Sequence, residues 1–488
     1  IAIRNIGSIE TLTLNNVSLT IRRLRKDRRA IMKILFATAE AFPFIKTGGL
    51  GDVAYSLPKA LHKEDIDIRI ILPKYSKIKS ELLKKQQHIG HKKIWVAHHN
   101  EYVGVETVLY KGIPYYFIDN ERYFKRNTIY GEFDDCERFL FFAKAVVETM
   151  DITGFTPDII HCNDWQTGLI PIYLKERGKQ DIKTIFTIHN LRFQGFFFNN
   201  VIESLLEIDR YKYYHEEGIK YYDMISFLKA GVVYSDYITT VSESYEEEIK
   251  TPELGEGLHG LFQKLEYRLS GVVNGIDKSS YPLPKKSKED LKTALQKRLG
   301  LKVEKDIPLI AMITRLDSQK GIDFVIEKMD EIMSMGVQFI LLGTGEDRYE
   351  NFFRWKESQY PGYLCSYIGF DSDLSLEIYQ GADLFLMPSV YEPCGLAQMI
   401  AMRYGCVPVV RETGGLRDTV TPYNEYTGEG DGFGFRELIA NDMMKTLHYA
   451  IRTYHNPKEW HILVENAKKR KNSWKESAKK YQVIYQKV

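Results

Sequence analysis

The sequence Glu40-Ala-Phe-Pro-Phe-Ile-Lys-Thr-Gly-Gly-Leu-Gly-Asp-Val-Ala-Tyr-Ser-Leu-Pro-Lys-Ala60 joins an expected strand to an expected helix. Residues 33–38 before it form an apolar run of strand length, and apolar residues after it recur at helical spacing. Gly48 and Gly49 would let a ligand reach the backbone N–H groups where the helix begins, and Lys46 adds a cation there. The spacing matches neither the dinucleotide fingerprint nor the P-loop. The loop therefore predicts a site for a phosphate-bearing or sugar-bearing ligand, with a plain structural turn as the alternative.

Length and composition limit the class of protein. A chain of 488 residues is too long for one compact core and suits two domains of roughly 200 residues each. A net charge of +2 argues against a nucleic-acid partner, and no apolar run is long enough to suggest a membrane partner. The five cysteines form no CxxC pair, and no secretory signal is recognisable, so we expect reduced thiols and a cytoplasmic location.

Short apolar runs alternate with helical patterns along the first half of the chain. Residues 135–148, for example, carry apolar side chains at the 3.6-residue period of a helix. This alternation predicts an α/β fold with a parallel sheet, whose ligands bind at the carboxyl ends of the strands. The strands that we expect are residues 33–38, 67–72, 105–110, 113–118, 159–162, 184–187 and 237–241.

A second series of strands follows and predicts a second α/β domain. The expected strands are residues 309–313, 339–342, 364–368, 384–387 and 407–410. Glycines and charged residues follow these strands as they follow the first set, which suggests a cleft between two domains. We expect an N-terminal domain at residues 32–270, a C-terminal domain at 271–465, and a helical segment at 466–488 that returns to the first domain. Residues 1–31, ahead of Met32, are expected to be a disordered or non-native leader, with a transit peptide as the alternative.

Four motifs in this order and spacing closely resemble those of bacterial glycogen synthases and the related starch synthases. They are Lys46-Thr-Gly-Gly-Leu50, Thr187-Ile-His-Asn190, residues 315–320 and Glu392-Pro-Cys-Gly-Leu396. The resemblance extends from about Met32 to the C-terminus. It implies two Rossmann-like domains in the GT-B arrangement. It also implies a retaining transfer of glucose from ADP-glucose to the non-reducing end of an α-1,4-glucan such as glycogen.

The departure of a nucleoside diphosphate builds up negative charge that the enzyme must stabilise. Arg315 and Lys320 suit this task, because a guanidinium can grip a phosphate with two N–H groups and an ammonium supplies a point charge. The pairs Asp65/Asp67 and Asp371/Asp373 have the spacing of a metal-binding motif but lack further oxygen ligands, so we expect neither a metal nor another cofactor. We expect Asp371 to cap a helix instead. The resemblance places ten residues at the donor: Lys46, Gly48, Gly49, Asn274, Cys394, Gly395, Leu396, Thr413, Gly414 and Gly415.

Two further residues complete the predicted catalytic set with Arg315 and Lys320. Glu392 is the only carboxylate in its motif. It could act as a nucleophile, but we favour a role in holding sugar hydroxyls and offsetting the positive charge of the transition state. His189 alone would suggest a buried packing histidine, and the resemblance implies contact with the donor glucose. The thiol of Cys394 is expected to pack, because no histidine accompanies it to form a nucleophile.

On the acceptor side we expect Glu40, Asp164, Trp165 and Asn190, which lie near strand ends of the first domain. A carboxylate next to an indole ring suits glucose, although Trp165 could equally belong to the core. Two other functions stay open: a GT-B enzyme that uses UDP-glucose, and a catalytically weak glucan-binding protein. The only hint of the latter is the linker after Asp277, where Tyr281-Pro282 replaces the Trp-x-Pro usual in the family.

Overall fold

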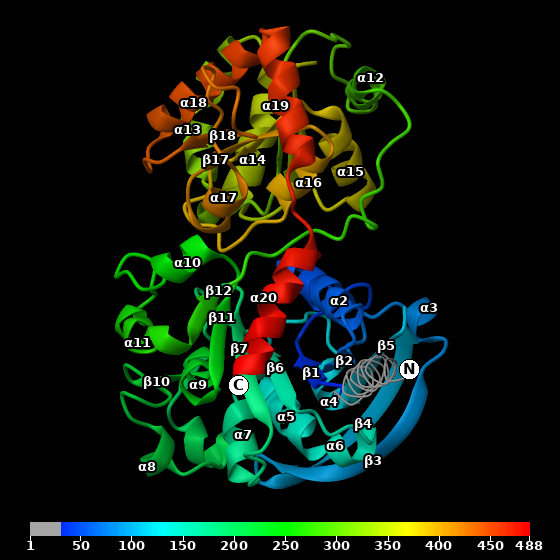
Figure 1. The fold of residues 1–488 in the computed structure, drawn as a ribbon, viewed down its shortest axis with the longest axis vertical. Coiled ribbons are helices and arrows are strands. Elements are labelled where there is room, and N and C mark those ends of the chain that lie inside the picture. The colour runs from blue at the N-terminus through cyan, green and yellow to red at the C-terminus, as the bar shows by residue number, and fades with distance from the viewer. Residues whose placement is uncertain (1–30) are drawn as a thin grey trace, which may run out of the picture.

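Two sheets, each with its own set of helices, organise residues 31–488, the part of the chain that the computed structural model describes (Figure 1). Residues 1–30, nearly all of the predicted leader, lie outside the described residues. In Figure 1 the first sheet occupies the lower lobe and the second sheet the upper lobe, and α20 (Trp474–Lys487) runs from the upper lobe onto the lower one. None of the helices among residues 31–488 is both long enough and apolar enough to cross a membrane.

The first sheet has the order β12-β11-β7-β6-β1-β2-β5-β4-β3. The strands from β12 to β5 are parallel, and β4 and β3 continue the sheet as an antiparallel hairpin. The sequence analysis did not predict β3 and placed the start of β4 too late, because these strands are partly exposed and lack a continuous apolar run. The strands are β1 Lys33–Ala37, β2 Asp67–Pro73, β3 Gln87–Val96, β4 His99–Tyr110, β5 Ile113–Asp119, β6 Ile159–Asn163, β7 Lys183–Ile188, β11 Tyr237–Thr240 and β12 Leu269–Gly271.

The second sheet is parallel throughout, with the order β15-β14-β13-β16-β17-β18. Its first five strands match the expected ones within a residue or so at each end. A small antiparallel sheet, β8-β10-β9, is attached to the first lobe. The remaining strands are β8 Phe196–Phe198, β9 Lys220–Tyr221, β10 Met224–Ser226, β13 Leu309–Ile313, β14 Gln338–Gly343, β15 Leu364–Ile368, β16 Leu384–Met387, β17 Val407–Arg411 and β18 Phe433–Phe435.

Both large sheets reverse their strand order at one position. The chain leaves β1 toward β2 on one side, and β6 later pairs with the other side of β1. In the second sheet, β14 and β16 flank β13 in the same way. Two loops diverge at such a switch point and leave a crevice outside the carboxyl ends of the strands. The four recognised motifs follow β1, β7, β13 and β16, so all of them lie at or beside a switch point.

Local sequence signals account for several of the helices. The predicted helix at residues 135–148 is α5, and it is buried on all sides, because every residue from Arg138 to Val147 is buried and not only those at the 3.6-residue period. The side chain of Asp371 accepts hydrogen bonds from the N–H groups of Asp373 and Leu374, which confirms the predicted cap of α15. The helices of the first lobe are α2 Gly49–His62, α3 Ser80–Leu83, α4 Glu121–Phe124, α5 Asp135–Glu148, α6 Met150–Thr153, α7 Ile170–Glu176, α8 Arg210–Tyr213, α9 Phe227–Tyr234, α10 Glu243–Glu248 and α11 His259–Lys264.

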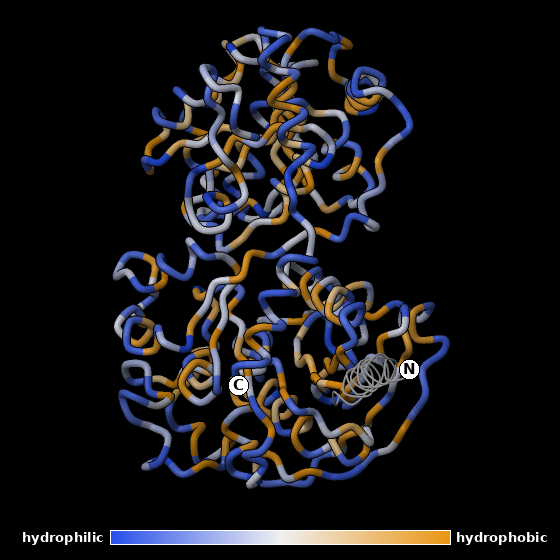
Figure 2. Tube along the Cα trace, viewed as in Figure 1, coloured by the Kyte–Doolittle hydropathy of each residue, from blue (hydrophilic) through white to orange (hydrophobic). Residues whose placement is uncertain are grey.

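The helices of the second lobe pack on two buried clusters, one of which continues from the first lobe. Hydrophobic residues concentrate inside each lobe and hydrophilic residues on the outside (Figure 2). The shared cluster fills most of the first lobe and reaches α12, α15 and α16, and the other cluster is made mainly by β13, β14, α13 and α18. These helices are α12 Lys288–Arg298, α13 Ile322–Ser334, α14 Asp347–Gln359, α15 Ser372–Gly381, α16 Ala397–Arg403, α17 Gly414–Thr419, α18 Ala440–Tyr454 and α19 Pro457–Lys469.

The last helix, α20, is fastened to the first lobe by a buried polar contact. It packs against α2, and the hydroxyl of Tyr485 lies 2.8 Å from Nδ1 of His161 in β6. The other ring nitrogen of His161 lies 2.6 Å from Oγ1 of Thr187 in β7. Burial lowers the pKa of His161 to about 3, so the imidazole is neutral at pH 7. The C-terminal helix thus bonds to the two strands that precede Asp164 and His189.

We predict that Tyr485→Phe lowers the free energy of unfolding by about 1–3 kcal/mol, because it leaves a buried nitrogen of His161 without a partner. Urea denaturation followed by circular dichroism measures the change. Tyr211→Phe is the control, since the Tyr211 side chain is almost fully exposed. Equal unfolding midpoints for the wild type and Tyr485→Phe would show that this contact does not hold α20 in place.

Candidate active site

The glycine-rich loop after β1 is folded around the carboxylate of Glu40. This carboxylate accepts hydrogen bonds from the backbone N–H groups of Thr47 and Gly48, and from Oγ1 of Thr47 at 2.6 Å. The hydroxyl of Tyr130 donates a fourth bond at 2.7 Å. Glu40 is buried, and both of its carboxylate oxygens are engaged within the protein. The predicted acceptor role of Glu40 stays a prediction, and the structure adds the role of organising the loop.

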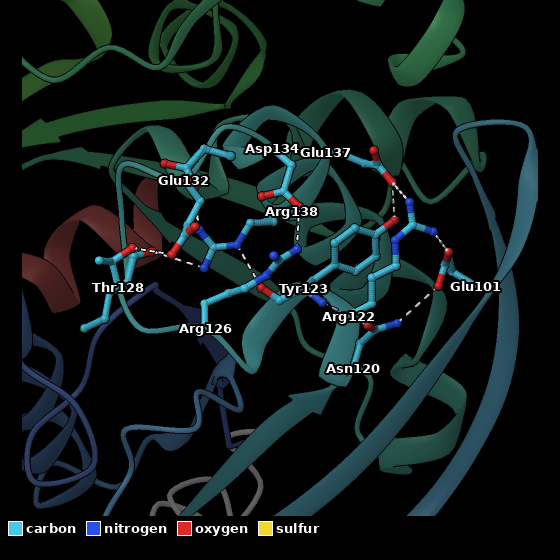
Figure 3. A network of polar contacts seen from close by, with 12 residues as sticks. Glu101, Asn120, Arg122, Tyr123, Arg126, Thr128, Glu132, Asp134, Glu137 and Arg138 are labelled. Carbon is cyan, nitrogen blue, oxygen red and sulfur yellow. Dashed lines mark hydrogen bonds and ion pairs between the residues drawn. The ribbon is translucent and has the colours of Figure 1, made fainter.

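Tyr130 belongs to a segment, residues 120–138, that a network of charges holds in place (Figure 3). Figure 3 shows Arg122 between Glu101 and Glu137, and Arg126 against Asp134. The guanidinium of Arg138 is completely buried, pairs with Asp135, and donates to the carbonyl of Tyr123 at 2.8 Å. Because a buried charge is tolerated only when it is paired, this network fixes the segment that carries Tyr130 to Glu40. No motif or local pattern in the sequence points to Tyr130.

The glycines of this loop occupy their positions for different structural reasons. A Cβ atom on Gly51 would lie 3.0 Å from two side-chain carbons of Lys46, so packing alone explains Gly51. A Cβ atom on Gly48 or Gly49 would meet no atom within 4 Å, and neither residue needs a left-handed backbone. Nothing in residues 31–488 therefore requires glycine at these two positions, which favours the ligand interpretation of the loop. Nζ of Lys46 lies 2.7 Å from Asp52 beside them.

Asp164 follows β6 in a strained conformation, with φ of 55° and ψ of 177°. Strain of this kind costs of order 1–3 kcal/mol and is common at functional sites. The Asp164 carboxylate accepts hydrogen bonds from the backbone N–H groups of His189, at 2.7 Å, and of Asn190. Burial, with a smaller contribution from the charge of Glu40, raises the pKa of Asp164 to about 7 against the effect of those two N–H groups. The loops that follow β6 and β7 are thus directly bonded.

His189 is held as a neutral imidazole with a defined tautomer. Burial lowers its pKa to about 3. Its Nε2 lies 2.9 Å from Oδ1 of Asn163, whose Nδ2 donates to the carbonyl of Ala37. Because Oδ1 of Asn163 can only accept, Nε2 of His189 must carry the proton. Nδ1 is then an acceptor, and it has no partner among residues 31–488 that satisfies hydrogen-bond geometry. It is suited to a ligand hydroxyl and not to proton donation.

Trp165 and Asn190, the other predicted acceptor residues, have different surroundings. The indole ring of Trp165 is 9% exposed and packs edge-on against Phe139 at a centroid distance of 4.9 Å, with Phe197 and Phe227 also adjacent. The core interpretation therefore explains most of its contacts, and its acceptor role stays a prediction. Asn190 is partly exposed and faces the hydroxyl of Tyr391 in the second lobe.

In the second lobe, Lys320 and Glu392 form a direct ion pair. Nζ of Lys320 lies 2.6 Å from Oε2 of Glu392, and Oγ of Ser389 donates to the same oxygen at 3.0 Å. The side chains of Lys320 and Glu392 are only 16% and 9% exposed. Arg315 is more accessible: its side chain is 53% exposed, and its guanidinium lies 3.4 Å from Asp317. The four predicted catalytic residues are therefore divided between the lobes, with His189 in the first and the other three together in the second.

The predicted donor residues after Glu392 pack backbone to backbone against residues 413–415. The N–H of Gly415 donates to the carbonyl of Glu392 at 3.0 Å, and a Cβ atom on Gly415 would lie 2.3 Å from Cα of Cys394. Gly395 has φ of 72°, which favours glycine. Packing within the protein thus accounts for Gly415 and backbone conformation for Gly395. Cys394 and Thr413 are buried, and burial raises the pKa of the Cys394 thiol to about 12, so it stays protonated.

The two lobes meet at these loops. Oγ of Ser242 donates to the carbonyl of Pro393 at 2.6 Å, and the carboxylate of Glu248 accepts from Oγ1 of Thr413 and from the N–H of Gly414. The N–H groups of Gly414 and Gly415, which we expected to face the donor, are thus bonded to protein groups here. Sequence reasoning missed Ser242 and Glu248, because their role depends on contact between the lobes.

The linker between the lobes is bonded on both sides. Asp277 accepts from Nζ of Lys59 in α2 at 2.6 Å, and the carbonyl of Tyr281 accepts from Arg403 in α16 at 2.5 Å. Asn274, ahead of them, is buried, and its Oδ1 has no partner in residues 31–488. The same described residues contain no group of three or more His, Cys, Asp and Glu side chains that could hold a metal ion.

We predict that Gly49→Ala folds normally but raises the KM for ADP-glucose, the donor that the resemblance implies, about tenfold or more. The new methyl group meets no protein atom and would occupy the space that a ligand needs to reach the first N–H groups of α2. Gly260→Ala is the matched control, because Gly260 also lies at the start of a helix, α11, in open space. Initial rates and melting temperatures would be measured for both. An unchanged KM in Gly49→Ala would favour the plain structural turn.

Comparison with known proteins agrees with this division into lobes. Residues 33–264 match the family model described as starch synthase catalytic domain, and residues 295–470 match the model described as glycosyl transferases group 1. The solved catalytic domain of starch synthase IV from Arabidopsis thaliana, bound to ADP and acarbose, is 31% identical with a TM-score of 0.89, over 94% of this chain and 99% of that one. Sucrose-phosphate synthase from Thermosynechococcus elongatus, at 16% identity and a TM-score of 0.61 over 93% and 98% of the chains, shares the fold.

Curated relatives match nearly the whole chain. Glycogen synthase from Fusobacterium nucleatum is 73% identical over 458 residues, which cover 94% of this chain and 99% of that protein. Glycogen synthase from Clostridium acetobutylicum is 46% identical over 479 residues, covering 94% and 100%. The predicted fold class, two α/β domains in the GT-B arrangement, is confirmed. With the four motifs at or beside the two switch points and relatives matching 94% of its length, this chain belongs to the glycogen synthase family of glycosyltransferases.

Proposed function

We propose that the chain elongates an α-1,4-glucan by transferring glucose from ADP-glucose to its non-reducing end, with retention of configuration. The observation that carries the proposal is the buried ion pair between Lys320 and Glu392, 2.6 Å apart, with Arg315 in the same loop as Lys320. Cations and a carboxylate are what the transfer needs, since the diphosphate becomes negative and the sugar becomes positive. The Arabidopsis starch synthase IV structure, which holds ADP and acarbose, supports the same assignment.

The donor diphosphate would lie between the two switch points. Arg315 and Lys320 would contact it from the second lobe, and Lys46 with the open loop at Gly48 and Gly49 would contact it from the first. In this structure Lys320 is paired with Glu392 and Lys46 with Asp52, so both ammonium groups are already aligned by carboxylates. Preorganised charges of this kind stabilise a transition state without reorganising during the reaction.

Glu392 has surroundings that favour an electrostatic role over a nucleophilic one. Its Oε2 accepts from both Lys320 and Ser389, which withdraw electron density from the carboxylate. Pairing with an ammonium group makes a carboxylate less nucleophilic, because it stabilises the negative charge that would attack. We therefore assign Glu392 to the sugar, where its negative charge offsets the oxocarbenium character. Retention would then follow from attack on the same face, with the departing phosphate taking the proton of the acceptor hydroxyl.

His189 and Asp164 are assigned to sugar hydroxyls in the first lobe. The neutral His189 presents Nδ1 as an acceptor to a donor-glucose hydroxyl, in line with its tautomer. Asp164, fixed by the N–H groups of His189 and Asn190, is next to it and would bind the acceptor. ADP-glucose and the glucan are the partners implied. The predicted absence of nucleic-acid and membrane partners stays a prediction, as does the cytoplasmic location.

The assay that tests this function supplies the purified protein with glycogen and either ADP-glucose or UDP-glucose, and measures nucleotide release. We expect faster turnover with ADP-glucose, and activity that survives excess EDTA because Arg315 and Lys320 supply the positive charge. Faster turnover with UDP-glucose would assign a different donor. Turnover with neither donor would support the glucan-binding protein, and loss of activity restored by magnesium would contradict the predicted independence of metal.

We predict that Lys320→Ala lowers kcat by about a hundredfold to a thousandfold, with a smaller change in the KM for ADP-glucose. The contact strengthens as the glycosidic bond breaks, so it lowers the barrier more than it tightens donor binding. Steady-state kinetics with saturating glycogen separate the two constants.

Lys320→Arg and Lys305→Ala are the controls for this variant. Lys320→Arg should recover part of the activity, because a planar guanidinium does not occupy the position of an ammonium. Lys305 is exposed and pairs only weakly with Glu289, at 3.5 Å, so Lys305→Ala should leave both constants unchanged. If Lys320→Ala raised KM alone while kcat stayed the same, Lys320 would be a binding contact and the proposed stabilisation of the leaving group would be wrong.

A further inference from the structure

Gln319 precedes Lys320 in the loop that carries both cations of the proposed site, and its side chain is buried. It is 4% exposed and sits in the short turn at Ser318–Lys320 that follows β13. Its Oε1 accepts from the guanidinium of Arg315 at 3.3 Å, and its Nε2 donates to the backbone carbonyl of Tyr391 at 3.3 Å. One buried amide therefore connects Arg315 to the residue that precedes Glu392.

The partners of this amide fix its orientation. A guanidinium has only donors and a carbonyl has only lone pairs, so a flipped amide would place like groups against each other at both ends. Only a side chain as long as glutamine that ends in an amide can accept a hydrogen bond from Arg315 and donate one to Tyr391. A methionine would fill the same volume with neither contact. Both bonds are at the long end of the normal range, so Gln319 matters more for where it places its neighbours than for binding strength.

The backbone around Gln319 joins the same two loops. The N–H of Val390 donates to the carbonyl of Gln319 at 2.8 Å. A Cβ atom on Gly321 would lie 2.0 Å from the carbonyl oxygen of Pro388, so the loops touch through their main chains. These loops leave the neighbouring strands β13 and β16 at the switch point of the second sheet. Gln319 thus lies where the loop of Arg315 and Lys320 and the loop of Glu392 come closest.

We infer that Gln319 is a positioning residue for the transfer reaction. It holds the guanidinium of Arg315 at a fixed place relative to the backbone that carries Glu392, so that the charge facing the diphosphate and the charge facing the sugar keep their separation. This inference rests on the proposed function. Gln319 itself touches neither the donor nor the acceptor in this assignment, and it acts through Arg315.

A purely structural role for Gln319 predicts something different. If Gln319 only packs and forms hydrogen bonds in the core, its substitution would lower the melting temperature and leave kcat per folded molecule unchanged. A positioning role lowers kcat in the folded enzyme, because misplacing a catalytic group by about 1 Å can cost on the order of a hundredfold in rate. It also predicts that the loss of kcat depends on Arg315, because without that guanidinium Gln319 has no catalytic group to position.

The test combines Gln319→Met and Gln319→Ala with Arg315→Ala in a double-mutant cycle. After the wild type has been shown to turn over ADP-glucose with glycogen, kcat, KM and melting temperature are measured for each variant. We expect each Gln319 variant to lower kcat about tenfold or more, with a smaller change in the donor KM. In the Arg315→Ala background the same substitutions should lower kcat by less than about twofold. Methionine and alanine differ in size, so if one of the two variants fails to fold, the other still tests the inference.

Gln296→Met is the matched control, since Gln296 is also fully buried in the second lobe. Its amide bonds to Glu304 and to Gln338 at the start of β14, whereas the loops of the site follow the carboxyl ends of the strands. It should lower the melting temperature while leaving kcat unchanged. An equal loss of kcat with and without Arg315, or no loss in folded Gln319 variants, would overturn the positioning role while the proposed function stands. A wild type without turnover would remove the proposed function and this inference with it.

Discussion

The ion pair between Lys320 and Glu392 is the contact on which the second half of the site depends. Removing either partner of such a buried pair would leave a charge without compensation, at a cost of about 3–5 kcal/mol. The pair joins the loops that follow β13 and β16, which are neighbours in the sheet. The spacing of two adjacent parallel strands therefore sets the distance between Lys320, the proposed contact to the diphosphate, and Glu392, the proposed contact to the sugar. The strand order of the second sheet thus determines how far apart the two charged groups lie.

Glycine serves this arrangement in two physically different ways. At Gly321, Gly414 and Gly415 an added Cβ atom would come within about 2 Å of backbone atoms of another segment, so glycine is needed for loops to touch. At Gly48 and Gly49 an added Cβ atom would meet nothing. Contacts within the protein thus explain glycine at positions 321, 414 and 415, whereas no such contact explains it at positions 48 and 49. The two glycine-rich motifs should therefore not be interpreted alike.

The sequence predicted the fold well because its signals are local. Apolar runs identified the buried strands, and Asp371 identified the cap of α15. The sequence did not predict β3, half of whose residues are exposed. Around the site, motif spacing found Lys320 and Glu392, and the structure shows them paired. Tyr130 and Glu248 could not be found this way, because each contacts its partner across about 90 or more intervening residues. Gln319 was within a recognised motif, but its role depends on where Tyr391 lies.

Some buried polar atoms without partners lie near the proposed site, and others lie elsewhere in residues 31–488, as at Tyr75 and Gln296. Those near the site include Asn274 Oδ1, Asp317 Oδ1 and the hydroxyl of Tyr391, which satisfies no hydrogen-bond geometry although Asn190 and Arg192 face it. Buried polar groups of native proteins are nearly always hydrogen-bonded, and a lone pair or N–H left over costs about 1–3 kcal/mol. Such groups are therefore expected where a polar ligand or ordered water completes the bonding. The proposed site is such a place, because both substrates are rich in hydroxyl and phosphate oxygens.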